Sequence, residues 1–261
     1  MNTQDFITEL FCRIDDALQE VPKHSQATLY PSEVVTIALL FALKGGHGRA
    51  FYRWLKRDWR ALFPKLPERT RLFRLFVSHQ PLTAKLMAEP TLLGVIDSYG
   101  IELLHPIRQG RSDQQIGKKG LSNHRWIVGG KLCLLLNQFG LVVACAFSTA
   151  NVYDAHFHPL IEAVADQMIV LADSHFHAKR GDPANLKLCP RGTWNDRMVI
   201  ETVLSMLTTI MHFKKVFHRT WPQFQARLGF TMAIFNILAQ WHGLTPDDTG
   251  FVPLSIAQFS L

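Results

Sequence analysis

Three acidic residues stand at positions from which their carboxylates could act together. Asp97 ends the short apolar run TLLGVIDS, Asp173 ends the run MIVLADSH, and Glu201 lies one to two turns into a long apolar helical segment. Ligands of α/β proteins bind at the carboxyl ends of buried strands, and Mg²⁺ prefers oxygen ligands and offsets their mutual repulsion. The three acids therefore predict a divalent-metal site, in which two ions roughly 3.5–4 Å apart would activate a water or a hydroxyl against a phosphodiester.

Each acid also has a simpler interpretation when it is taken alone. Asp97 could cap a turn that follows it. Asp173 could pair with Lys179 or Arg180, and Glu201 could pair with Arg197 one helical turn earlier. Only the three acids together, in this order of strands and helices, favour the metal site.

The histidines offer a rival metal site. His175 and His177 follow Asp173 and give the pattern D-x-H-x-H, which invites a zinc interpretation. We expect these two histidines in a loop after the apolar part of the strand. A second pair, His156 and His158, falls on a predicted helix, where positions i and i+2 diverge by about 200°. The carboxylate site is therefore the favoured hypothesis.

The elements that must position these acids follow from the hydrophobic pattern. Strands are expected at 91–98, 124–136, 141–151, 168–175 and 184–190, and helices at 153–166, 195–215 and 222–241. The turn Asn137–Gly140 predicts a hairpin between the second and third strands. This order predicts an α/β fold with a mixed five-stranded sheet and helices on both faces.

The first 85 residues have the pattern of an all-helical region. Apolar residues recur at helical spacing in 6–21 and 31–44, and residues 49–76 mix arginines with aromatic side chains. Within the last segment, Arg69, Arg71 and Arg74 could face phosphates or base edges, although a solvated helix face would look the same. We therefore expect a helical DNA-binding region at 1–85, an α/β domain at 90–245 and a tail at 246–261.

The charge and hydrophobicity of the chain bear on which partners it could bind. The chain has 261 residues and a formal net charge of +7, which suits a nucleic acid or an anionic membrane surface. The longest apolar runs, 34–43 and 228–241, are shorter than the roughly 18 residues of a membrane span, so we expect core helices and no membrane. The four cysteines form no CxxC pair and no signal peptide is evident, which favours a cytoplasmic protein.

Several segments of the chain resemble the DDE transposases of bacterial insertion sequences, and the resemblance covers most of the chain. The matching segments are VIDSYGIELLHPIRQGR, GGKLCLLLNQFGLVVACAFSTANVYDAHFHPLI, LADSHF and NDRMVIETVLSML. The N-terminal part is most similar to the IS982-type subgroup. The resemblance implies a ribonuclease-H-like catalytic domain in which Asp97, Asp173 and Glu201 hold Mg²⁺ or Mn²⁺.

The resemblance also implies a reaction and its partners. A water cuts the phosphodiester at the element end, and the freed 3′-OH attacks target DNA. The partners would be double-stranded DNA, as terminal repeats and target site, and a second copy of the chain in a homodimer. The DNA-contacting residues it implies are Arg197, Trp194, Lys131, Lys118, Lys119 and Arg125. A solvated strand edge is the alternative for the lysines.

The chain departs from the family pattern at several positions. Related IS4-type transposases carry a Tyr and a Lys where this chain has Trp194 and Thr208, and Thr208 supplies no charge. His212 and Lys215 would share the helix face of Glu201, but roughly 16 and 21 Å further along. A catalytically decayed, transposase-derived DNA-binding protein is therefore the alternative function.

Overall fold

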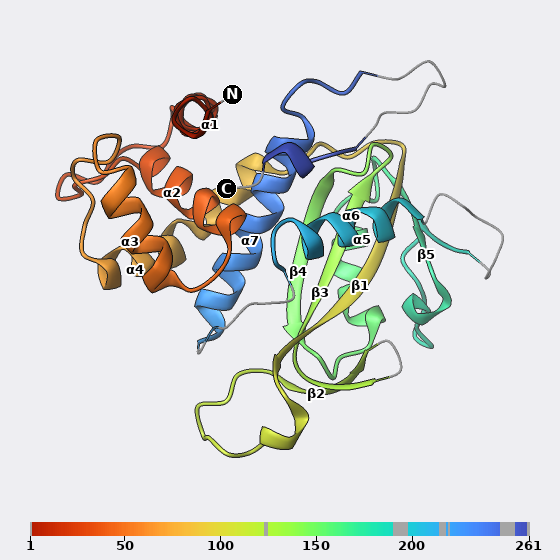
Figure 1. The fold of residues 1–261 in the computed structure, drawn as a ribbon. Helices are drawn as coiled ribbons and strands as arrows, with labels where there is room; N and C mark the ends of the chain where they lie inside the picture. Colours follow the sequence, from red (N-terminus) through yellow and green to blue (C-terminus); the bar gives the residue numbers. More distant parts are fainter. Residues whose placement is uncertain are drawn as a thin grey trace.

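The computed structural model describes residues 2–122, 125–189, 198–213, 218, 220–245 and 254–259. Four N-terminal helices lie on one side of the molecule and a sheet lies on the other, with a long C-terminal helix between them (Figure 1). The helices are α1 (Thr3–Leu18), α2 (Pro31–Lys44), α3 (Gly48–Asp58), α4 (Arg69–His79), α5 (His158–Glu162), α6 (Met198–Thr209) and α7 (Trp221–Ala239). Short 3₁₀ turns are η1 (Gln80–Leu86), η2 (Pro106–Arg108), η3 (Asp154–Phe157), η4 (Ser174–Phe176) and η6 (Ala257–Phe259).

The sheet is mixed, which confirms the expected α/β class. Its strands are β1 (Leu93–Leu104), β2 (Lys118–Ser122), β3 (Arg125–Asn137), β4 (Val142–Thr149), β5 (Ile169–Ala172) and β6 (Leu186–Leu188). The strand order along the sheet is β2-β3-β1-β5-β6, and β4 also pairs with β3. Both β2 and β4 run antiparallel to β3, which is itself antiparallel to β1, and β5 and β6 run parallel to β1. The five predicted strands are present, and β2 is an additional one.

The predicted hairpin between β3 and β4 is confirmed, and its turn is fixed by local hydrogen bonds. The Asn137 side chain accepts hydrogen bonds from the backbone N–H groups of Phe139 and Leu141, and Gly140 adopts a φ of 75°. A positive φ favours glycine. The turn therefore has the residues that its conformation requires.

The prediction that Asp97 ends the first strand is wrong. Asp97 is the fifth residue of β1, a strand of 12 residues that continues to Leu104. Beyond Asp97 the strand stays paired with β3, as in the pairs Tyr99 with Leu132 and Ile101 with Gly130. The extension is set by this long-range pairing, because the residues after Asp97 form no apolar run.

Helices cover both faces of the sheet. One face buries Ile96, Cys133 and Val170 with residues of the α5 region such as Ile161. The other face buries its side chains in a larger core with α6 and α7, and α6 contacts β1 directly. Since side chains alternate along a strand, neighbouring residues of β1 face these two cores in turn.

The helix with Glu201 is shorter than predicted. It ends at Thr209 instead of continuing to 215, and His212 takes a left-handed conformation with a φ of 51°. Helices commonly end with such a residue. The change of direction buries Phe213, whose ring lies 6.0 Å from that of Tyr99 on β1. His212 therefore does not share a helix face with Glu201, and Lys215 lies outside the described residues.

Helix α7 joins the N-terminal helices to the sheet. It is buried on almost every side, as expected for a helix that is apolar all round. The Asn236 side chain, which is fully buried, accepts from the Val142 N–H at 2.8 Å and donates to the Val142 carbonyl at 2.7 Å. At its other end, Arg227 donates to the carbonyl oxygens of Phe41 and Ala42 on α2. One continuous core thus spans both predicted regions.

Membrane-spanning potential is limited in the described part of the chain. No single helix there is both long and apolar enough to cross a bilayer. Helices α2 and α3 reach the required length and hydrophobicity only as a pair, and the two are bent by 118°.

Candidate active site

Asp97 lies within β1, and Asp173 directly follows the adjacent strand β5. Strands β1 and β5 are parallel, and their last paired residues are Val95 and Leu171. Asp97 and Asp173 each come two residues after these paired residues, Asp97 within the strand and Asp173 as the N-cap of η4. Val95 belongs to the core shared with α6, and alternation along β1 gives Asp97 the same side of the sheet.

Glu201 is brought to the same side of the sheet by α6. It lies in the first turn of this helix and is exposed, while the neighbouring Ile200 and Val203 are buried against the core. Its helix contacts β1, the strand that bears Asp97. Arg197 and Trp194, predicted to contact DNA, lie outside the described residues, so their part in the site stays a prediction.

The Asp173 carboxylate is already held by local hydrogen bonds. It caps η4 by accepting the backbone N–H of His175 at 2.9 Å, and its second oxygen lies 3.1 Å from the His175 ring. The next histidine, His177, bonds to the Asp182 carboxylate at 2.8 Å. The two histidines of the D-x-H-x-H pattern thus pair with two different carboxylates.

Within the described residues, no group of three or more His, Cys, Asp or Glu side chains is arranged to hold a metal ion. Among these residues, neither the D-x-H-x-H pattern nor the three acids form such a group. Two of the predicted ligands, Asp97 and Asp173, thus belong to or directly follow adjacent strands, and no complete three-ligand group is formed among the residues that the structure describes.

Lys131 has a structural partner on the opposite side of the sheet. Its ammonium lies 2.9 Å from the Asp154 carboxylate and donates to the Val152 carbonyl at 2.8 Å, and the Lys131 side chain is only 11% exposed. Asp154 also accepts a hydrogen bond from the Ser98 hydroxyl. These contacts tie the turn after β4 to β1 directly beside Asp97, and Lys131 is not displayed for DNA.

The thiol of Cys133 responds to both of these acidic positions. Burial raises the pKa of Cys133 well above its ordinary value, and the negative charges of Asp154 and Asp97 raise this pKa further. Cys133 is paired with Ser98 across β1 and β3. Sequence reasoning missed Ser98 because its contact with Asp154 links positions far apart in the chain, and nothing local indicates it.

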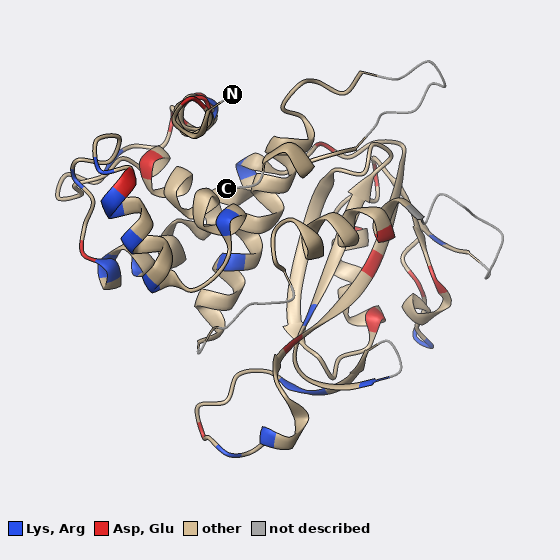
Figure 2. Ribbon diagram, in the orientation of Figure 1, with Lys and Arg blue, Asp and Glu red and all other residues tan. Residues whose placement is uncertain are grey.

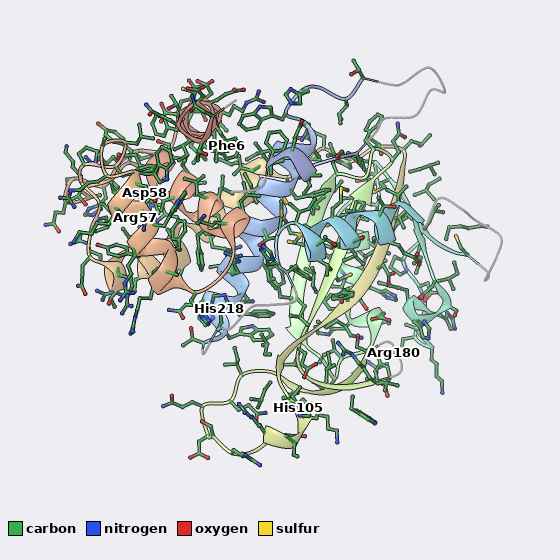
Figure 3. The ribbon with its side chains drawn as sticks, viewed as in Figure 1. Phe6, Arg57, Asp58, His105, Arg180 and His218 are labelled. Atoms are coloured by element: carbon green, nitrogen blue, oxygen red, sulfur yellow. The ribbon has the colours of Figure 1, made fainter. Side chains whose placement is uncertain are left out.

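The remaining predicted DNA contacts that the structure describes form two groups, in which every side chain except the partly buried Arg69 is exposed. Lys118, Lys119 and Arg125 lie on β2 and the start of β3, a ribbon beside the projecting loop that begins after His105 (Figure 3). The Lys119 ammonium lies 5.1 Å from the ring centre of Trp126, which is itself exposed. The second group, Arg69, Arg71 and Arg74, is on α4.

Comparison of the chain with protein-family models, with curated proteins and with solved structures gives no match.

Proposed function

We propose that this chain is a DDE-type transposase with a ribonuclease-H-like catalytic domain. It would hydrolyse phosphodiesters at the ends of an insertion sequence and join the freed 3′-OH to target DNA, acting as a homodimer on double-stranded DNA. The observation that carries the proposal is the parallel pairing of β1 with β5, in which Asp97 and Asp173 each come two residues after the last paired residues, Val95 and Leu171. Two carboxylates carried by neighbouring strands suit chemistry on a phosphate ester.

The strand arrangement supports the proposal. Four strands, β1 to β4, joined by antiparallel pairs, are followed by the helix α5 and then by two strands parallel to β1. Apart from the additional strand β2, this is the order that the sequence predicts. Asp97 lies in β1, Asp173 directly follows β5, and Glu201 lies in α6, the helix that follows β6. No other pair of acids lies at matching positions of neighbouring strands among the described residues.

Asp97, Asp173 and Glu201 would hold Mg²⁺ or Mn²⁺. Their donor atoms suit these ions, because all are carboxylate oxygens. Bound ions would stabilise negative charge on the attacking and leaving oxygens. The chain's own contribution is positional: the paired strands β1 and β3 fix Asp97, and the turn at η4 fixes Asp173.

Nicking of supercoiled plasmid DNA with Mg²⁺ or Mn²⁺ tests this proposal. The wild type should nick, and Asp97→Asn, Asp173→Asn and Glu201→Gln should each lower the rate by a factor on the order of 10³ or more. Asp182→Asn is the matched control, because Asp182 is also paired with a histidine but lies on the loop after η4. If Asp173→Asn nicks as well as the wild type, Asp173 has no role in the chemistry.

A second candidate is a transposase-derived protein that binds DNA without cutting it. Two observations favour it: the described residues form no three-ligand metal group, and the Asp173 carboxylate is held by His175. Thr208, at the position of the family lysine, adds no charge to α6. The same assay separates the two candidates, because this protein would retain plasmid in a gel shift and nick it no faster than the Asp97→Asn variant.

A further inference from the structure

A cavity of about 320 Å³ opens in the N-terminal helical region, away from the acidic residues. Its walls come from the end of α2, the start of α3, one face of α4 and the beginning of α7. Figure 2 shows Lys and Arg concentrated over α3 and α4, around this part of the molecule. Figure 3 places His218, which lines the cavity, beside the beginning of α7.

The lining of the cavity is strongly cationic. Arg49 of α3, Arg69 and Arg74 of α4, and Arg227 of α7 all contribute to it, and none of the described residues that line it is Asp or Glu. Four guanidinium groups from three helices thus surround one concave space. Guanidinium groups bind phosphate oxygens through pairs of parallel hydrogen bonds.

Arg227 lines this cavity, and within the described part of the chain it contacts backbone carbonyl groups and an aromatic ring. It is 5% exposed, donates to the carbonyl oxygens of Phe41 and Ala42, and lies 4.4 Å from the Phe41 ring centre. Burial lowers the pKa of Arg227 to about 9, so the side chain stays charged at neutral pH. A buried charge is costly without an opposite charge, and an anion in the cavity would supply one.

The start of α3 adds to the attraction for anions. Gly48 is the first residue of this helix, and the preceding His47 makes no side-chain capping bond to it. The first turn of α3 contains no acidic residue. Backbone N–H groups at the start of a helix carry partial positive charge, and here they adjoin a cavity that is already cationic.

We infer that this cavity binds a phosphate group, either one of the DNA backbone or one of a free nucleotide. The inference deepens the proposed function, on which it rests, by assigning the N-terminal helices a defined anion pocket in addition to an exposed basic face. It makes Arg69 and Arg74 pocket residues and leaves Arg71, on the same helix, outside the lining. The three arginines of α4 should therefore differ in how much each contributes to phosphate binding.

The matched pair Arg74→Gln and Arg71→Gln tests this difference. Both side chains are exposed on α4, but only Arg74 lines the cavity. Affinity for a short duplex is measured by fluorescence anisotropy, and binding of inorganic phosphate and a deoxynucleoside monophosphate by calorimetry. Arg74→Gln should weaken binding about tenfold and Arg69→Gln/Arg74→Gln further, with the slope of log affinity against log salt smaller by about 0.9 for each lost contact. Arg71→Gln should change affinity less than about threefold.

The two sources of phosphate give different results. If only the duplex responds to Arg74→Gln, the pocket takes a backbone phosphate; if the mononucleotide or phosphate binds and is lost in Arg74→Gln, it takes a free phosphate ester. Equal effects of Arg71→Gln and Arg74→Gln on every ligand would overturn the inference. The nicking assay is a separate readout. If the protein does not nick DNA but Arg74→Gln still weakens binding selectively, only the proposed chemistry is contradicted. If the protein nicks DNA but Arg71→Gln and Arg74→Gln have equal effects on binding, only the pocket is contradicted.

Discussion

Asp97 and Asp173 each come two residues after Val95 and Leu171, the last paired residues of the adjacent parallel strands β1 and β5. The relationship joins positions that are far apart in the chain, and Asp97 lies on β1, the strand that α6 contacts. Pairing β1 with β3 holds the first aspartate, and the η4 turn holds the second. The proposed chemistry depends on this placement.

We expect Lys131 to stabilise the folded protein. Lys131→Met should lower the free energy of unfolding by about 2 kcal/mol, because it leaves the Asp154 carboxylate, 17% exposed, without its cation. Urea unfolding measures the change. Lys118→Met, on the exposed strand β2, is the control and should stay within about 0.5 kcal/mol. Equal stability losses for the two variants would contradict a structural role for Lys131.

Asn236 should be essential to the joint between α7 and the sheet. Asn236→Leu removes the side-chain partner of the Val142 N–H, while the Val142 carbonyl still accepts the backbone N–H of Ala88 at 2.9 Å. We expect a loss of about 2 kcal/mol in the free energy of unfolding, since an unpaired buried polar group costs about 1–3 kcal/mol. The exposed Gln240 on the same helix end serves as the control, as Gln240→Leu. A loss below about 1 kcal/mol for Asn236→Leu would show that water or rearrangement replaces these bonds.

His218 should make stability depend on pH. Burial and the nearby Arg227 lower the pKa of His218 to about 4 in the folded protein, against about 6.5 when unfolded. Between these values only the unfolded chain binds the proton, so stability is lost as pH falls from about 6.5 to about 4, by at most about 3 kcal/mol. His218→Gln should flatten this part of the pH profile of unfolding. An unchanged profile would mean that other groups cause the dependence.

The basic ribbon of β2 and β3 should bind DNA without reading its sequence. Lys118→Gln/Lys119→Gln should weaken all duplexes similarly and lower the salt slope by about two, because both ammonium groups are exposed. Anisotropy titrations between 50 and 200 mM salt measure the slope. Arg57→Gln is the control, since Arg57 is exposed and engaged by Asp58. A loss confined to one DNA sequence would argue against a backbone contact.

Local signals explain the parts of the fold that the sequence predicts well. The turn residues Asn137 and Gly140 define the β3–β4 hairpin, and the apolar run before Asp173 defines β5. Errors occur where distant pairing decides the structure. β1 continues past Asp97 because β3 pairs with it, and α6 ends at Thr209 as Phe213 packs on Tyr99.

The site shows the same division between local and distant causes. Asp97 and Asp173 could be chosen from their place after apolar runs, although the actual length of β1 was not predictable from its polar second half. The family resemblance implies that Lys131 contacts DNA. Its bond to Asp154 depends on how the turn after β4 folds back, which no spacing in the sequence indicates.

Titration with Mn²⁺ tests the central claim most directly. Ion binding is measured by calorimetry for the wild type, Asp97→Asn, Asp173→Asn and the double variant. If the two carboxylates share an ion, each single variant should lose affinity at least about tenfold, and the double variant should lose little more than either one, since the effects of contacting residues do not add. Unchanged affinity in both single variants, or losses that simply add in the double variant, would contradict a shared site.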